Sequence, residues 1–363
     1  MRRPGSVRTL LSCLSATSLS VGLMALGGGA ALAAPDAPSA ATPAAAKPRP
    51  APVVAPYFET WTGQSPAELA AASGNTYLTL AFLQTSTPGS CTAYWDGDTG
   101  RPIAKDAFGR DIARLQARGG NAIPSFGGWS ADTTGTELAD SCTDVDAIAA
   151  VFKSLVTTYG ITRIDLDVEG DSIDNAAGID RRNKAIAKVE RWAEHTGRSV
   201  RFSYTLPTST TGLAANGLAV LRNAVDNGAR VDVVNLMTFD YYDGATHDMA
   251  ADTATAATGL HGQLAALYPK KSSTKLWNMI GVIEMPGIDD YGPEETFTTE
   301  NAVTVEKWAE ARGINTLSFW ALQRDNGGCV GTGGSDSCSG IAQDTWYFSH
   351  TFEALAAAHH AHP

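Results

Sequence analysis

Apolar and polar positions alternate along this chain with two different periods. Short stretches repeat every two residues, as half-buried strands do, and longer stretches repeat with the period of amphipathic helices. The eight predicted strands lie at 53–61, 77–84, 122–129, 163–170, 199–207, 231–241, 276–285 and 315–322. The predicted helices are a short one opened by Ser65 and Pro66, then those at 108–118, 144–159, 175–195, 217–227, 253–267, 302–312 and 352–358.

Regular alternation of strands and helices favours one architecture. Eight strand–helix units in a chain of this length predict an α/β fold, a (β/α)₈ TIM barrel forming a single domain over 53–358. The alternative is a doubly wound sheet, which would be expected to carry a glycine-rich phosphate loop after a strand. Neither GxGxxG nor a P-loop motif occurs in the sequence. In a TIM barrel the functional residues lie at the C-terminal ends of the strands.

The fourth predicted strand carries an unusual set of acids. Asp165, Asp167 and Glu169 alternate with aliphatic residues, so their side chains share one face of the strand. Carboxylates this close repel one another, and at least one should keep its proton near neutral pH, as a general acid must. The alternative is a solvated acidic edge strand. The apolar flank at Ile161 and the following Gly170 instead favour an interior strand that ends at a loop.

Aromatic residues gather at the other predicted strand ends. The C-terminal parts of the first, third, sixth and eighth predicted strands contain Tyr57, Trp129, Tyr241 and Trp320, respectively. Aromatic rings stack on the apolar faces of sugar rings, while carboxyl groups bind hydroxyls and donate protons to glycosidic oxygens. The combination points to a carbohydrate site. Tyr57 and Trp129 could line sugar subsites, although many strand-end aromatics belong to the core.

Four motifs, in order along the chain, resemble those of glycoside hydrolase family 18. The acidic strand resembles the DGxDxDxE signature, and Ser125-Phe126-Gly127-Gly128 matches SxGG. The segment from Met237 to Asp240 resembles MxYD, and Trp320 matches the tryptophan beneath the substrate. Within the family, the chain is most similar to secreted actinobacterial chitinases of the group that includes the Pyrococcus chitinase domains.

The resemblance implies a chemistry and a set of roles. The expected reaction is hydrolysis of β-1,4-linked N-acetylglucosamine with retention of configuration, the nucleophile being the substrate's own acetamido oxygen. Glu169 would protonate the glycosidic oxygen and then act as base on water. Asp167 would bind the acetamido N–H, and Asp165 would share a proton with Asp167. Trp320 would lie beneath the distorted sugar, and Ser125 could hydrogen-bond the deep aspartate.

The two glycines of the SxGG match have two possible roles. Gly127 and Gly128 could let the backbone approach the substrate closely, because glycine lacks a Cβ atom. The alternative role is tight packing at a strand end. Both glycines are therefore candidate substrate-binding residues in a supporting role.

The chain departs from the family pattern at two places. The first Asp-Gly of the signature falls on threonine and arginine at 162–163. Loss of this Asp affects the pKa values of the other acids more than the chemical step itself. Phe239 replaces the tyrosine whose hydroxyl holds the acetamido carbonyl, a bond that phenylalanine cannot make. Alternation places Met237, Phe239 and Tyr241 on one face, so Tyr241 is predicted to supply the hydroxyl. The alternative is an aromatic rim contact. Asp240 would point to the other face unless the strand ended at Phe239.

The segment between the seventh and eighth predicted strands also bears on function. It is too short to hold the small α+β domain that deepens the cleft of tunnel-like relatives. The resemblance therefore implies an open groove and cleavage inside the polymer.

The N-terminus has the features of a secretory signal. Three arginines within the first eight residues precede an apolar stretch at 10–26, and Ala-Leu-Ala at 31–33 is a plausible cleavage site. We therefore expect a signal peptide at 1–33 and an extracellular protein. An Ala/Pro-rich linker is expected at 34–52 and a disordered tail at 359–363.

Cysteine usage agrees with secretion. Apart from Cys13, which lies in the expected signal, the chain has four cysteines, an even number that predicts two disulfides. Three connectivities are possible. We expect Cys91–Cys142 and Cys329–Cys338, because the members of each pair lie in loop-like sequence at a similar stage of the chain. A zinc site is not favoured, since no CxxC motif or nearby histidine cluster occurs. No metal and no cofactor are expected.

Charge and composition limit the classes of molecule that the protein is expected to bind. The 363-residue chain is 44% hydrophobic and has a formal net charge of -11, which argues against nucleic-acid and anionic-membrane partners. The expected partner is chitin or another N-acetylglucosamine-containing glycan, bound by a monomer. Three functions remain open: a secreted chitinase, an endo-β-N-acetylglucosaminidase acting on N-glycans, and a catalytically silent sugar-binding barrel. Glu169 favours an enzyme, because silent relatives typically lose this acid.

Overall fold

The computed structural model describes residues 52–361. The expected signal peptide and all but the last residue of the expected linker lie outside this range. The strands are β1 (Val53–Val54), β2 (Tyr57–Glu59), β3 (Tyr77–Thr85), β4 (Ala93–Trp95), β5 (Asn121–Gly127), β6 (Arg163–Asp167), β7 (Arg201–Pro207), β8 (Val233–Met237), β9 (Ile280–Glu284) and β10 (Thr316–Phe319).

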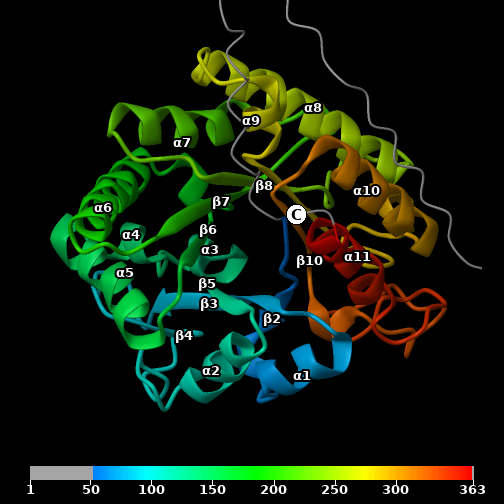
Figure 1. Cartoon of the computed structure of the whole chain (residues 1–363), viewed down its shortest axis with the longest axis horizontal. Helices are drawn as coiled ribbons and strands as arrows, with labels where there is room; N and C mark the ends of the chain where they lie inside the picture. The colour runs from blue at the N-terminus through cyan, green and yellow to red at the C-terminus, as the bar shows by residue number, and fades with distance from the viewer. Residues whose placement is uncertain (1–51, 362–363) are drawn as a thin grey trace, which may run out of the picture. The chain divides into compact units, whose positions relative to one another are not determined.

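The helices follow the strands in the expected alternation. They are α1 (Pro66–Ser73), α2 (Gly109–Ala117), α3 (Trp129–Thr134), α4 (Leu138–Ser141), α5 (Val145–Tyr159), α6 (Ala176–His195), α7 (Ala215–Asp226), α8 (Met249–Leu267), α9 (Ser273–Trp277), α10 (Thr299–Arg312) and α11 (Tyr347–Ala361). Figure 1 shows the longer helices as a ring around the strands, with the chain passing round the ring in order. None of the helices within 52–361 has a stretch long and apolar enough to cross a membrane.

The sheet confirms the predicted (β/α)₈ barrel. Its strand order is β1-β10-β9-β8-β7-β6-β5-β3-β2, and every neighbouring pair in this order is parallel. The short strand β4 lies off this path, where it pairs with β3 and is antiparallel to it. The C-terminal ends of the barrel strands therefore meet at one end of the barrel, where a TIM barrel carries its functional residues.

The first predicted strand forms the seam of the barrel. It divides into β1 and β2 at Pro56, which has no N–H to donate to a ladder. Val53 and Val54 pair with β10, whereas the three residues of β2 pair with β3. One short segment thus joins β10 to β3 and closes the sheet.

The helices begin and end where the sequence indicates. The Asp144 carboxylate caps α5 by accepting hydrogen bonds from the backbone N–H groups of Asp146 and Ala147, and Gly160 ends this helix with a φ of 67°. Between helices and sheet the core is aromatic: the rings of Phe126, Phe152 and Phe202 pack edge to face, with centroid distances of 5.1 and 5.5 Å.

Both expected disulfides are present. Cys91 and Cys142 join the β3–β4 connection to the end of α4, with an S–S distance of 2.01 Å. Cys329 and Cys338 close a loop between β10 and α11. The predicted connectivity is confirmed.

Element boundaries differ from the predictions at two places. The sixth predicted strand, 231–241, ends four residues early at Met237, because the chain turns into a loop in which Asp240 and Tyr242 both have a φ of 53°. At the other end of the chain, α11 continues to Ala361, past the expected domain end at 358.

Glu284, at the end of β9, is a buried acid outside the barrel interior. Its Oε1 accepts a hydrogen bond of 2.9 Å from the Thr253 hydroxyl on α8, its Oε2 has no partner, and burial raises its pKa to about 8. A carboxyl pKa raised by folding adds stability that is complete below the unfolded-state pKa and is lost as the pH rises through the folded-state pKa.

We therefore expect Glu284→Gln to stabilise the protein at pH 8 relative to wild type, by about 2 kcal/mol or more, and to have much less effect at pH 5. Thermal unfolding of both proteins at the two pH values measures this difference. Glu310→Gln, at an exposed position on α10, is the control and should show no such pH dependence. Equal effects of Glu284→Gln at both pH values would contradict the interpretation.

Candidate active site

The three acids lie at the C-terminal end of β6. Asp165 and Asp167 are within the strand, and Glu169 follows two residues after its end. The ladder continues only as far as Val168, whose N–H donates to the carbonyl of Thr205 at 2.9 Å. Alternation therefore places Asp165 deep in the barrel and Asp167 above it, and leaves Glu169 on the backbone that leaves the sheet.

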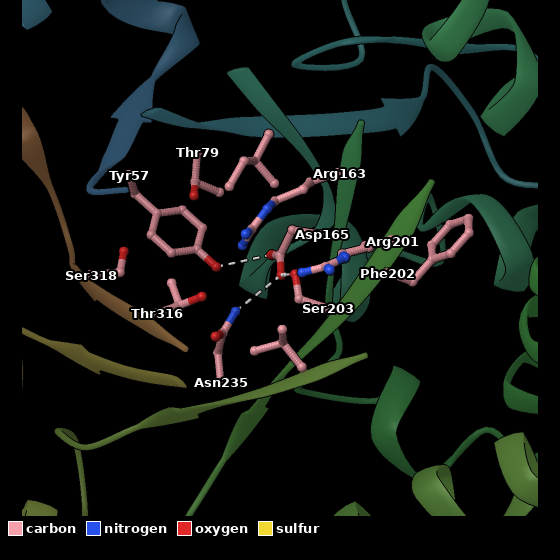
Figure 2. Close-up of a pocket in the computed structure, with 12 residues that line it drawn as sticks. Tyr57, Thr79, Arg163, Asp165, Arg201, Phe202, Ser203, Asn235, Thr316 and Ser318 are labelled. Atoms are coloured by element: carbon pink, nitrogen blue, oxygen red, sulfur yellow. Dashed lines mark hydrogen bonds between the residues drawn. The ribbon is translucent and has the colours of Figure 1, made fainter. Parts of the chain in front are cut away.

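Asp165 is fixed by hydrogen bonds from four strands. It is 1% exposed, and Figure 2 shows Tyr57 and Asn235 approaching it from two sides. Its two oxygens accept bonds from Tyr57 Oη (2.9 Å), Ser125 Oγ (2.7 Å), Thr205 Oγ1 (3.0 Å), Asn235 Nδ2 (3.4 Å) and Ser203 Oγ. Burial raises the pKa of this carboxyl, and the hydroxyl donors act in the opposite direction. The predicted contact from Ser125 is confirmed.

A cavity of about 20 Å³ lies in the barrel interior next to Asp165. Its walls include Asp165, Arg163, Arg201 and Thr316, and its volume suits a single water molecule. The arginine at the departure from the family signature therefore occupies the barrel interior. Burial lowers the pKa of Arg163 to about 10, and the like charge of Arg201 adds to this effect.

Asp167 has the opposite environment. Its carboxyl group is buried, makes no hydrogen bond, and leaves Oδ1 without a partner. Burial raises the pKa of Asp167 well above its usual range, and the nearby charges of Glu169 and Asp165 raise it further. No hydrogen bond joins the two aspartates in the described chain. Because buried polar atoms are nearly always satisfied, Asp167 is suited to receive a donor from a bound ligand.

Glu169 is poised to lose and regain a proton near neutral pH. Burial raises the pKa of its carboxyl group to about 7, and the backbone N–H of Trp129 partly offsets this rise. The backbone N–H of Glu169 donates a 2.7 Å hydrogen bond to Asp132 Oδ2. Trp129 begins α3 beside this acid, and the residue is 65% exposed.

Gly127 and Gly128 pack too closely for any side chain. A Cβ atom at Gly127 would lie 2.0 Å from the carbonyl oxygen of Asp167, and one at Gly128 would lie 2.6 Å from the ring of Phe82. Their φ angles of 96° and 82° also favour glycine. The packing role of the two glycines is therefore present in the structure.

Aromatic rings line one side of the acids. Trp320, just after β10, stacks on Phe82 with a centroid distance of 5.6 Å and an interplanar angle of 11°. Its Nε1 donates to Asp336 Oδ1 at 3.3 Å. Trp61 is 40% exposed, and its ring centroid lies 6.2 Å from that of Trp320. Trp61 also lines an open groove of about 1040 Å³. Polar side chains such as Gln323 also line this groove.

Comparison with known proteins places this site in a family. The model of the family "Glycosyl hydrolases family 18" matches residues 53–287, which contain the three acids and both glycines. This chain belongs to glycosyl hydrolase family 18.

Three relatives illustrate the match. A probable bifunctional chitinase/lysozyme of Escherichia coli (strain K12) is 30% identical over 305 residues, covering 80% of this chain and 33% of the relative. Endochitinase 11 of Metarhizium anisopliae is 33% identical and covers 59% of this chain and 42% of the relative. The chain thus spans less than half the length of these two proteins.

The third relative is a solved structure. Catalytic-site mutants of active domain 2 of a thermostable chitinase from Pyrococcus furiosus, complexed with chito-oligosaccharides, are 30% identical to this chain. The TM-score is 0.74, and the match covers 86% of this chain and 96% of the other.

The strand alternation used to place the Tyr241 hydroxyl at the acids does not hold in the structure. Because β8 ends at Met237, the two-residue alternation does not extend to Phe239 and Tyr241. Phe239 is buried in the core, and the Tyr241 ring lies 5.0 Å from that of His247. Burial, followed by the charge of Glu284, raises the pKa of Tyr241. The Tyr241 hydroxyl is buried and has no hydrogen-bond partner in the described chain. Its action at the acids stays a prediction.

The loop after β8 is held by acids of the β9–α10 connection. Glu295 accepts hydrogen bonds from the backbone N–H groups of Tyr241 (2.7 Å) and Tyr242 (3.0 Å). Asp289 accepts one from Asp240 (3.0 Å). Burial and these acids raise the pKa of Asp240 to about 7. A contact of Asp240 or of Met237 with substrate stays a prediction.

Tyr57 has a different role from the predicted one. It is 2% exposed, and its hydroxyl is engaged by Asp165 and Thr205, so it does not line a sugar subsite. Trp129, which is exposed beside Glu169, remains available for that purpose.

Sequence reasoning missed four residues of this site. Ser203 and Thr205 alternate with apolar residues along β7, and Asn235 lies inside β8, so alternation on these two strands could have revealed the polar face around Asp165. Asp132 lies on a short helix 37 residues before its partner Glu169. No local pattern marks such a contact.

Proposed function

We propose that this protein is a secreted chitinase that hydrolyses β-1,4-linked N-acetylglucosamine polymers with retention of configuration. The observation that carries the proposal is the difference in environment among the three acids at the C-terminal end of β6. Asp165 is saturated with hydrogen bonds, Asp167 has an unpartnered carboxyl oxygen, and Glu169 has a pKa of about 7. Family membership and the likeness to the Pyrococcus furiosus domain support the same assignment.

The proposed reaction has two steps. Glu169 gives its proton to the glycosidic oxygen as the C–O bond breaks, and the carbonyl oxygen of the substrate's acetamido group attacks the anomeric carbon from the other face. Asp167 accepts the acetamido N–H and stabilises the positive oxazolinium ion. Water then attacks the anomeric carbon as the bond from this carbon to the acetamido oxygen breaks, and Glu169 takes a proton from the water. Two inversions give net retention. Trp320 would form the floor beneath the reacting sugar.

We further propose that cleavage occurs inside the polymer. Between β9 and β10 the described chain holds one single-turn helix and α10, and the groove beside Trp61 is open. An open groove can hold a polysaccharide without threading an end.

Secretion is part of the proposal as well. The two disulfides are typical of proteins that fold in an oxidising compartment. The N-terminal sequence has the pattern of a signal peptide. We propose that the chain acts as a monomer.

Activity should depend on pH through Glu169. Since burial raises its pKa to about 7, the carboxyl group is protonated below that pH and can act as the acid. We therefore expect kcat/KM on a soluble N-acetylglucosamine oligosaccharide to fall about tenfold per pH unit once the pH exceeds the pKa of Glu169. A profile between pH 4 and 9 measures this limb. Undiminished kcat/KM at pH 9 would contradict the assignment.

The direct test of function is incubation with two substrates. Chitin oligosaccharides and a high-mannose glycoprotein should be treated separately, and the products identified by mass spectrometry and by the anomeric configuration of the new reducing end. Internal cleavage of the oligosaccharides with β products supports the proposal. Release of N-glycans alone would identify an endo-β-N-acetylglucosaminidase instead. Binding without any product would identify a silent barrel.

A further inference from the structure

The segment 128–132 holds the backbone of both acids at the end of β6. The N–H of Gly128 donates to the carbonyl oxygen of Asp167 at 3.3 Å, and the Asp132 carboxylate accepts the N–H of Glu169 at 2.7 Å. These two bonds engage the two peptide groups on either side of Val168, where β6 leaves the sheet. The direction of the Glu169 side chain depends on the orientation of the second of these peptide groups.

Asp132 is buried, and half of its carboxyl group is unused. The residue is 1% exposed, and its Oδ1 has no hydrogen-bond partner. A Cβ atom at Gly127 would lie 3.1 Å from this oxygen, and one at Gly170 would lie 3.6 Å from the Asp132 Cβ. The carboxyl group is therefore packed between the ends of β5 and β6.

The surroundings of Asp132 are rich in charge. Glu169 and Asp167 face it from β6, Glu137 faces it from the start of α4, and Arg182 faces it from α6. Arg182 is fully buried and pairs with Glu137 at 2.8 Å, so its positive charge is already balanced. Placing one more acid here has a desolvation cost that a neutral residue would avoid. A compensating role is therefore expected.

We propose that Asp132 is a positioning residue for the reaction: its carboxyl group fixes the Glu169 peptide so that the acid stays above Asp167. The inference rests on the proposed function for its catalytic consequence and on the hydrogen bond alone for its structural part. Beyond Val168 the sheet no longer binds the N–H groups of β6, and Asp132 supplies the acceptor that the ladder lacks. A buried N–H without an acceptor would favour a shift of this peptide.

Two substitutions separate the acceptor from the charge. Asp132→Asn keeps an oxygen acceptor for the Glu169 N–H, whereas Asp132→Leu has a similar size and keeps none. We expect kcat on N-acetylglucosamine oligosaccharides to stay within about threefold of wild type for Asp132→Asn. For Asp132→Leu we expect kcat to fall at least about tenfold with KM changed by less than about threefold.

A matched control addresses stability. Glu190 on α6 is also buried and also accepts a backbone N–H, that of Arg230 at 3.1 Å, on the outer layer of the barrel. Glu190→Met should lower the melting temperature as Asp132→Leu does, but leave kcat per folded molecule unchanged. Loss of kcat in the control as well would show a general effect of destabilisation and overturn the inference.

A second measurement needs no substrate. Hydrogen exchange of a peptide spanning 163–170, followed by mass spectrometry, should be faster in Asp132→Leu than in wild type and unchanged in Asp132→Asn. Unchanged exchange in Asp132→Leu, or equal damage by both substitutions, overturns the inference. If wild type hydrolyses none of the substrates, the proposed function fails while this exchange measurement still decides the role of Asp132.

Discussion

Replacing Glu169 by glutamine should abolish hydrolysis of N-acetylglucosamine oligosaccharides while leaving their binding nearly unchanged. The amide has the shape of the acid but cannot give a proton to the glycosidic oxygen or take one from water. We expect kcat to fall by at least about a thousandfold, within the range that removal of a general acid produces. Isothermal titration with a tetrasaccharide measures binding, and reducing-end release measures turnover.

Glu284→Gln is the matched control for this substitution. Glu284 is also a glutamate at a strand end with a raised pKa, but it contacts Thr253 on the outer side of the barrel. Its replacement should leave kcat unchanged. If Glu169→Gln kept activity within about tenfold of wild type, another group would have to supply the proton.

Gly127→Ala should disable the site through the backbone. The new Cβ atom would lie 2.0 Å from the carbonyl oxygen of Asp167, so the peptide carrying this acid must move by an ångström or more. A displacement of about 1 Å at a reacting group can cost a hundredfold in rate. We therefore expect kcat to fall by at least about a hundredfold, together with a lower melting temperature.

Gly197→Ala separates the collision from backbone strain. Gly197 also has a positive φ, 66°, but a Cβ atom there would meet nothing within 4 Å. Its replacement should reduce stability by about 1 kcal/mol and leave kcat unchanged. Comparable kcat in Gly127→Ala and Gly197→Ala, measured on folded protein, would show that Asp167 tolerates the movement.

The period of the apolar and polar positions predicted the barrel correctly, because side chains on a strand alternate between two faces that differ in polarity. The Asp165 and Asp167 positions followed directly from alternation on β6, and the cysteine pairing followed from the order of the loops. Alternation was reliable only within a strand. On β8 it was extended past Met237, where the structure turns, so alternation does not place Phe239 and Tyr241 on one face.

Contacts between distant segments set the limit of sequence reasoning. The antiparallel β4, the stacking of Phe82 on Trp320, and the bond from Asp132 to Glu169 each join parts of the chain that no local pattern connects. The division of the first strand into β1 and β2 is different, because Pro56 was visible in the sequence as a break in hydrogen bonding.

The seam formed by β1 and β2 has a consequence for biosynthesis. The residues that join β10 to β3 are among the first of the domain to emerge from the ribosome, whereas β10 itself emerges only near the end of synthesis. Until then the growing sheet has two open edges, with free N–H and C=O groups that can pair with other chains. The nascent protein should therefore depend on chaperone protection throughout its synthesis, and shortening at either end of the domain should favour aggregation over a smaller stable fold.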